Sequence, residues 1–566
     1  MMLTQTTPSL PATWINQRHT NPTATTVVVK SANALTWSPP TGTLVSVNPP
    51  NQVAADAEPF LHVTQMPSTL NATEVTYGPQ GLIHVKGGQM QVWEQASDNA
   101  LGQLMGRNAG RLTTAARLEG LGAALLEQVG SHGSSYRQSV VNVGAPNSAE
   151  KIQSKAASSL LEFQSTPTAR VELSIQTQSG AQVRLAIVDQ SEQGLHGTGL
   201  SVEVIVEGEL SEAERAALTS LASGFEKAIQ GLAGDATQVD LAGLTQFDSK
   251  VIAKLELTTS IYGRDEHGLR YEKLGASFKA DANTQEIQLR RPDGDVKMRT
   301  DLRQPALWGS GEQKAYAVRQ YLQQIDQAAQ RGHASADLVD MFKSTFVAMN
   351  AGYGTQELSD TTRAALVAAP VDPRTDAEAW SEADKSWLTG LADFDAKLSA
   401  TPRASNPRKT MELDSFVYAI NQTTAVSGSS RDNRAITQTQ TAELSAAYHQ
   451  SLYSSKPPDL TDETASQNYT YHQIEDNSSS QVQLAYEKDK LVDATLTQSS
   501  SRSQRVQKYE FAKLIEDRVT PPELRLKQTD LRPLLQQLEE QQAAHKITDE
   551  EKQKLFTTWH AMVFMA

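Results

Sequence analysis

The sequence contains no cysteine among its 566 residues. This absence excludes disulfide bonds, thiol nucleophiles, zinc fingers and clusters held by thiolates. Aromatic residues make up only 6% of the chain, so a core of aliphatic side chains is expected rather than large aromatic-lined pockets. No stretch approaches the roughly 18 consecutive apolar residues that a membrane-spanning helix needs. We therefore expect no transmembrane segment.

Positive charge is also scarce. The formal net charge is -14 and the sequence pI is about 5.4. Such an acidic surface repels nucleic acid and anionic membranes, so no nucleic-acid partner is expected. The most basic stretch, residues 290–303, carries aspartates among its cations, which indicates a solvated hairpin. The residues concerned are Arg290, Arg291, Asp293, Asp295, Lys297, Arg299, Asp301 and Arg303.

Recognisable catalytic and metal-binding motifs are missing as well. The chain has no HExxH pair, no Gly-x-Ser-x-Gly elbow and no phosphate-binding glycine loop. The densest group of potential metal ligands is Asp265-Glu266-His267, which lies between Gly263 and Gly268 and is typical of a polar turn. We accordingly assign no catalytic, cofactor-binding or metal-binding residue, and we expect no cofactor.

The first residues have no cationic start followed by an apolar segment and a small-residue cleavage site. The expectation is therefore a protein that is cytoplasmic, or that is exported without a cleavable N-terminal signal.

Hydrophobic periodicity predicts an α+β fold built from several modules, each an antiparallel β-meander closed by a helical hairpin. Val171, Leu173 and Ile175 alternate with polar residues, as a half-buried strand requires. Two capping boxes, Ser211 with Glu214 and Thr548 with Glu551, mark helix starts. The expected organisation is an extended or disordered arm over 1–72, a hairpin with a glycine-striped helix and linker over 73–167, a β-meander with helices over 168–263, β-hairpins with helices over 264–405, and a β-meander with a C-terminal helical hairpin over 406–566.

The last three blocks share the same order of strands and helices, which suggests an internal repeat. Few residues match between them, so the hypothesis rests on hydrophobic order alone. It requires the three blocks to have related strand orders.

A helix is predicted over 97–129, where leucines recur at helical spacing. Gly102, Gly106 and Gly110 stand four residues apart within it. Because each glycine costs a helix about 1 kcal/mol relative to alanine, such a row indicates close approach of another backbone. We interpret these glycines as a possible helix-packing interface, either within the domain or in a self-assembly.

The segment from Val204 to Arg215, VIVEGELSEAER, follows predicted strands in which apolar and polar residues alternate, and it precedes a predicted amphipathic helix. With its surroundings, about residues 171–234, it resembles uncharacterised gammaproteobacterial proteins of unknown function. The resemblance covers about a tenth of the chain and lacks the Phe- and Asp-rich segment that usually follows the helix in that family. It implies a bacterial origin and assigns no functional residue.

Two functional hypotheses remain. The first is a non-enzymatic binding or structural protein that assembles with a protein partner or with itself. The alternative is a hydrolase whose site is assembled between modules. A deep pocket with converging polar groups would favour the hydrolase.

Overall fold

The computed structural model describes residues 62–65, 76–77, 83–84, 89–95, 99–144, 166–194, 197–234, 239–351, 353, 380–428, 430 and 432–564. Its strands are β1 (His62–Gln65), β2 (Thr76–Tyr77), β3 (Ile83–His84), β4 (Gln89–Trp93), β5 (Tyr136–Gly144), β6 (Ala169–Thr177), β7 (Gln182–Gly194), β8 (Gly197–Glu207), β9 (Ile252–Arg264), β10 (Arg270–Asp281), β11 (Thr284–Arg291), β12 (Gly294–Asp301), β13 (Asp393–Ala400), β14 (Arg403–Ala404), β15 (Leu413–Gly428), β16 (Arg434–Ser451), β17 (Tyr469–Glu487), β18 (Lys490–Glu510) and β19 (Lys513–Asp530). Its helices are α1 (Ala100–Asn108), α2 (Thr114–Leu118), α3 (Leu121–His132), α5 (Glu212–Ser220), α6 (Ala222–Ala233), α7 (Ala242–Thr245), α8 (Gly311–Gly332), α9 (Ala336–Ala351), α11 (Glu382–Ser386), α12 (Arg532–Ala543) and α13 (Asp549–Val563).

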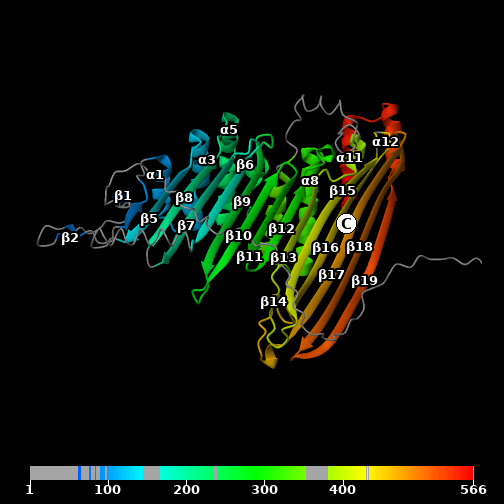
Figure 1. The fold of residues 1–566 in the computed structure, drawn as a ribbon. Helices are drawn as coiled ribbons and strands as arrows, with labels where there is room; N and C mark the ends of the chain where they lie inside the picture. The colour runs from blue at the N-terminus through cyan, green and yellow to red at the C-terminus, as the bar shows by residue number, and fades with distance from the viewer. Residues whose placement is uncertain are drawn as a thin grey trace, which may run out of the picture. The chain divides into compact units, whose positions relative to one another are not determined.

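Seventeen of the described strands belong to one sheet, and every pairing within it is antiparallel. The pairings place the strands in the order β1, β4, β5, β8, β7, β6, β9, β10, β11, β12, β13, β15, β16, β17, β18, β19, with the short β14 also paired to β15. Figure 1 shows the long strands β15 to β19 at one end of this sheet. The predicted α+β class is confirmed.

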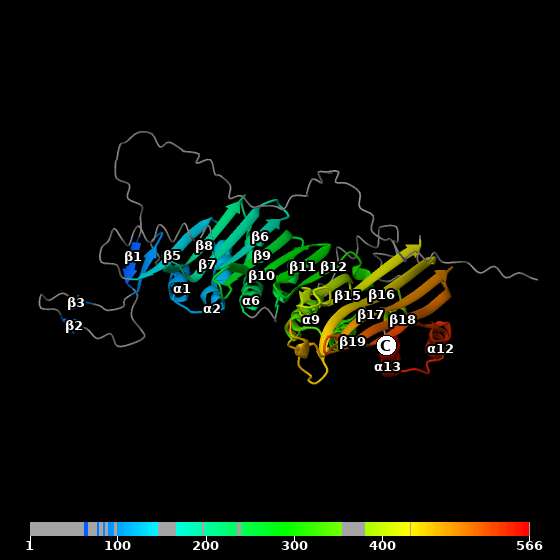
Figure 2. The ribbon, with the colours of Figure 1, turned by 90° about the horizontal axis from the view of Figure 1, so that it is seen from below.

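The helices lie against one face of the sheet (Figure 2). The first group, α1 to α3, contacts β5 and β7; α8 and α9 contact β12, β13, β15 and β16; α12 and α13 contact β17 and β18. Along each strand, alternate residues point toward these helices, and the buried ones in β6 include Val171, Leu173 and Ile175, as the alternation predicted.

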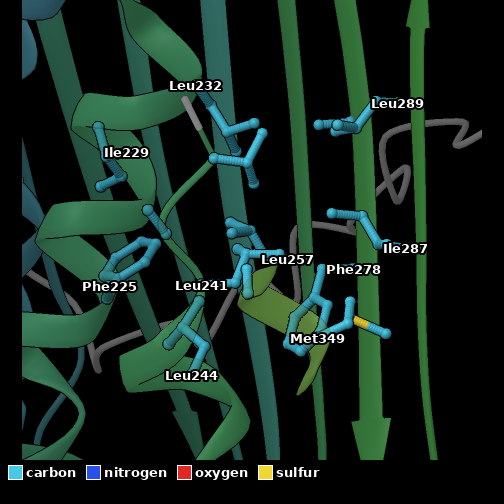
Figure 3. Close-up of a cluster of buried hydrophobic side chains, with 14 of the residues drawn as sticks. Phe225, Ile229, Leu232, Leu241, Leu244, Leu257, Phe278, Ile287, Leu289 and Met349 are labelled. Carbon is cyan, nitrogen blue, oxygen red and sulfur yellow. The ribbon is translucent and has the colours of Figure 1, made fainter. Parts of the chain in front are cut away.

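The hydrophobic core runs beneath the helices without a break at the expected block boundaries. Figure 3 shows this core extending from Phe225 and Ile229 of α6, past Leu257 of β9, to Phe278 of β10 and Met349 of α9. Strand pairing also continues across these boundaries: β5 pairs with β8, β9 with β10, and β13 with β15. The described strands from β4 to β19 therefore share one sheet, and β2 and β3 form a separate pair.

The opposite face of the sheet is polar and carries ordered charge. Lys279, Glu286, Arg299 and Asp395 stand opposite one another on β10, β11, β12 and β13, so the sign alternates from strand to strand. Opposite charges facing each other across strands each contribute about 0.2–1 kcal/mol to pairing. This alternation helps to fix the register where no hydrophobic contact is available on that face.

The three blocks each contain a meander followed by helices, but their strand orders differ. After α5 to α7, β9 returns beside β6, the first strand of its meander. After α8 and α9, β13 instead pairs with β12, the last strand of the preceding meander. The related strand orders that the repeat hypothesis requires are not found.

Two local expectations in the region 73–167 are also corrected. The hairpin expected at the start of this region does not form between β3 and β4, because β3 pairs with β2 while β4 pairs with β1 and β5. The segment expected to be a linker contains β5, an interior strand of the sheet. The arm expected over 1–72 lies outside the described residues except for β1.

The helix predicted over 97–129 is three helices. Thr113 accepts a hydrogen bond from the amide of Ala116 and so begins α2. The carboxylate of Glu226, on α6, accepts hydrogen bonds from the amides of Gly120 and Gly122 at the start of α3. In a continuous helix these amides would donate to carbonyl groups of the preceding turn. Here the carboxylate of a residue distant in the sequence accepts their hydrogen bonds instead.

Candidate functional site

The strand β19 forms an edge of the sheet. Among the described strands it pairs only with β18, and all of its residues except Thr529 are exposed. An edge of 18 residues presents a long row of backbone donors and acceptors that no other described strand uses. Exposed edges of this kind are templates for pairing with another chain.

An apolar stripe lies along β19 on the sheet face opposite the helices. Leu514, Val519, Leu524 and Leu526 are 49%, 61%, 71% and 68% exposed. Val519, Leu524 and Leu526 stand opposite Arg505, Ser501 and Ser499 of β18, whose neighbours Ser500 and Arg502 point to the helix side. Large exposed apolar groups gathered in one place are typical of interaction surfaces.

The strand bends at a bulge that holds two prolines. Arg502 pairs with Glu523 and Gln504 pairs with Thr520, so Pro521 and Pro522 together face the single residue between 502 and 504. Proline has no backbone N–H and is tolerated where the ladder is already interrupted. The bulge also adds one residue, so the helix-facing positions are even-numbered before it and odd-numbered after it.

Charged residues occupy the helix-facing positions on both sides of the bulge. Glu516 and Arg518 precede it, whereas Glu523, Arg525 and Lys527 follow it, so the first half carries one acid and one base and the second half one acid and two bases. On the other face, Asp517 accepts hydrogen bonds from Arg505 at 2.9 and 2.6 Å. These hydrogen bonds lower the pKa of Asp517 and raise that of Arg505. Asp517 is therefore neutralised within its own chain.

Sequence reasoning missed this surface. The segment from Lys513 to Asp530 contains two prolines and eight charged residues, so its sequence does not show the pattern of a strand. The one available signal is the alternation of Leu524 with Leu526, which ends six residues before the helix that begins at Arg532. Whether such a strand lies inside a sheet or at its edge is not a property of its own sequence.

The predicted helix-packing glycines lie in and just after α1. Gly102 is buried, and its amide donates to the Asn99 side chain that caps the helix. A Cβ on Gly106 would stand 3.2 Å from the side chains of Gln91 and Trp93, so this glycine packs against β4 of the same chain. Gly110 follows the end of the helix and is exposed. The structure therefore does not place the three glycines on one helix face.

A cluster of ionisable groups lies at the end of β16. The two ring nitrogens of His449 lie 2.6 Å from Asp414 Oδ1 and 3.2 Å from Glu412 Oε2. The Tyr469 hydroxyl and the Lys409 ammonium donate to the two oxygens of Glu412, at 2.8 and 3.1 Å. Because both ring nitrogens are engaged by carboxylates, His449 has no free nitrogen with which to deprotonate a nucleophile.

The pKa values in this cluster favour its charged form. Burial tends to lower the pKa of His449, but hydrogen bonds to Asp414 and Glu412 outweigh it and raise the value. Burial tends to raise the pKa of Glu412, whereas hydrogen bonds from His449, Tyr469 and Lys409 lower it to about 2. The His449 ring is held between two carboxylates, and the cluster ties the segment before β15 to β16.

The remaining groups that the sequence singled out are structural. Asp265 Oδ1 accepts from the amides of His267 and Leu269, which makes the predicted polar turn. Both capping boxes are formed. No group of His, Asp and Glu suited to hold a metal ion occurs within the described ranges. None of the described helices is long and apolar enough to cross a membrane.

Comparison with family models, curated proteins and solved structures found no match to this chain. Its function must therefore be inferred from its own residues.

Proposed function

We propose that this chain is a non-enzymatic assembly protein that self-associates through the free edge of β19. The observation that carries the proposal is the combination of an exposed apolar stripe and an acid-base pattern that is complementary to itself. Both lie on a strand whose outer edge pairs with no described strand. Pairing with a second copy would satisfy the backbone groups of the edge and cover the apolar stripe.

The geometry of such a dimer restricts the register. Two identical strands that pair antiparallel are related by a two-fold axis perpendicular to the sheet, so equivalent faces lie on the same side. Residues that face each other must then both point toward the helices or both away from them. Because the bulge shifts the alternation by one residue, an even-numbered residue before it must face an odd-numbered residue after it.

One register that meets this condition pairs Glu516 with Arg525 and Arg518 with Glu523 of the second copy. Each pair occurs twice because of the two-fold axis. Shifting the strand by two residues in one direction brings Glu516 opposite Glu523. Shifting it in the other direction brings Arg518 opposite Arg525, with only Glu516 opposite Lys527 as an ion pair. Like charges directly opposite are destabilising, and the unshifted register has none. The charge pattern therefore favours a single register, in which each ion pair contributes about 0.2–1 kcal/mol.

The same register brings the apolar side chains together on the outer face. Val519 of one copy becomes a diagonal neighbour of Leu524 of the other, a separation at which large side chains still make contact. Asp517, which faces Leu524 in this arrangement, is already paired with Arg505. Its carboxylate therefore needs no new partner when the edge is covered.

The test is sedimentation equilibrium of the full chain and of charge variants. The substitution Arg518→Glu places like charges opposite each other, and we expect it to raise the dimer dissociation constant by about tenfold or more. The double variant Arg518→Glu with Glu523→Arg exchanges the charges and should restore association. A monomeric wild-type chain over the accessible concentrations, or a double variant as weak as the single one, would refute the proposal.

A second pair of variants distinguishes a specific interface from nonspecific hydrophobic association. Leu524→Lys should abolish association, whereas Leu269→Lys should leave it unchanged. Leu269 is a suitable control because it is 67% exposed, similar to Leu524, but lies in the turn between β9 and β10. Equal effects of the two substitutions would contradict the assignment to β19.

A further inference from the structure

A cavity of about 310 Å³ lies between α8 and the helix-facing side of β16 to β18. Its volume is at the lower end of the range of about 300–1,000 Å³ for small-molecule sites. Its apolar part includes Tyr418 and Leu444, while its polar part is formed by side chains of α8, β17 and β18.

The polar groups of α8 reach the cavity from one helix face. Gln324 and Arg331 are separated by seven residues, two helical turns. Both polar atoms of the Gln324 amide are shielded from solvent and have no hydrogen-bond partner among the described residues. A buried amide without partners is costly, and a ligand in the cavity would supply them.

Positive charge on the strand side is only partly compensated. Asp476 of β17 stands directly opposite Arg502 of β18. Asp476 is instead held by Arg331, whose Nε and Nη2 donate to its two oxygens, the latter at 2.9 Å. These hydrogen bonds raise the pKa of Arg331. Glu523 of β19 also stands opposite Arg502, but it pairs with Arg525, at 3.5 Å. Among the charged residues that line the cavity, two arginines and one aspartate therefore leave a single excess positive charge.

Two hydroxyl groups complete the lining. Ser478 of β17 and Ser500 of β18 are paired across the strands and both line the cavity. A serine hydroxyl can donate and accept. Together with the Gln324 amide, these groups can bind the hydroxyls of a ligand.

We infer that this cavity binds a small monoanionic carboxylate carrying neighbouring hydroxyl groups, of the sugar-acid class. The Arg502 guanidinium would hold the carboxylate, because its planar fork matches two carboxylate oxygens. Gln324, Ser478 and Ser500 would bind hydroxyls, and the Tyr418 and Leu444 side would contact the apolar ring face. Arg502 stands directly opposite Glu523 of β19, so the site borders the β19 edge, but ligand binding does not require self-association.

The experiment is isothermal titration calorimetry of the full chain with glucuronate, with glucose and inorganic phosphate as comparison ligands. We expect saturable binding of glucuronate, and weaker binding of both glucose, which lacks the charge, and phosphate, which lacks the hydroxylated ring. Absence of glucuronate binding would overturn the proposal. Glucose binding as tightly as glucuronate would overturn the role of charge, and equal binding of phosphate would overturn the carboxylate assignment.

Two variants assign the binding to this cavity. Arg502→Gln should weaken glucuronate binding by about tenfold or more, while Arg505→Gln, on the same strand but the opposite face, should not. Gln324→Leu should also weaken binding but should raise the melting temperature of the unliganded chain, because it removes the unpartnered amide. A gain in stability with loss of binding excludes misfolding as the cause. Unchanged binding in Arg502→Gln and Gln324→Leu would overturn the location.

Discussion

The contact between α6 and α7 offers a sharp test of the packing. Gly224 and Gly243 meet there backbone to backbone. A Cβ added to Gly224 would lie 2.5 Å from the carbonyl carbon of Gly243 and 2.7 Å from its oxygen. Normal contacts of this kind are 3.4–4 Å, and backbone atoms cannot rotate away as a side chain can. Gly224→Ala must therefore push α7 outward, together with the buried Leu241 and Leu244.

The expected change in the free energy of unfolding is the difference between two opposing effects. Overpacking a well-packed core costs about 1–3 kcal/mol, and the rigid neighbour favours the upper end of that range. Alanine is better than glycine in a helix by about 1 kcal/mol. We therefore expect Gly224→Ala to lower the free energy of unfolding by about 2 kcal/mol.

Gly311→Ala is the matched control, because a Cβ at Gly311, the first residue of α8, meets nothing within 4 Å. This substitution should be neutral or stabilising by up to about 1 kcal/mol. The measurement is chemical denaturation of both variants beside the wild type. If Gly224→Ala proves as stable as Gly311→Ala, the close approach of α6 and α7 is wrong.

Arg117→Met should destabilise the fold by about 3–5 kcal/mol in thermal or chemical denaturation. The reason is that the Arg117 guanidinium donates a hydrogen bond of 2.5 Å to Asp189, and both side chains are buried, so the substitution would leave a buried carboxylate without its cation. A loss of stability below about 1 kcal/mol would contradict this account. The His449 cluster predicts a pH effect: the pKa of His449 is raised on folding, so its contribution is complete below its ordinary value of about 6.5 and is lost as pH rises through the folded value. His449→Gln should remove this decline in stability, and an unchanged pH profile in the variant would refute the role of the histidine. At the acid end, the lowered pKa of Glu412 stabilises the fold above about pH 4.5, and this part is lost as pH falls toward about 2; Glu412→Gln should reduce that acid-side loss.

Local chemistry was readable from the sequence because its causes lie within a few residues. The alternation of Val171, Leu173 and Ile175 gave the buried face of β6, since side chains in a strand alternate between two faces. The capping boxes at Ser211 and Thr548 formed because their donors and acceptors are three residues apart. The composition likewise excluded disulfide bonds and thiol chemistry, because the chain has no cysteine.

Tertiary structure alone decided which distant segments meet. The break before α3 depends on Glu226, more than a hundred residues away, and the place of β9 beside β6 rather than β8 depends on long-range hydrogen bonds. The same holds for both proposed sites. β19 is an edge only because no described strand follows it in the sheet. Arg502 lacks an acidic partner because Arg331 of α8 holds Asp476 and Arg525 holds Glu523. A local pattern specifies which face of a strand is apolar, but backbone pairing is the same for every sequence, so the neighbours of that strand are set by the packing of the whole chain.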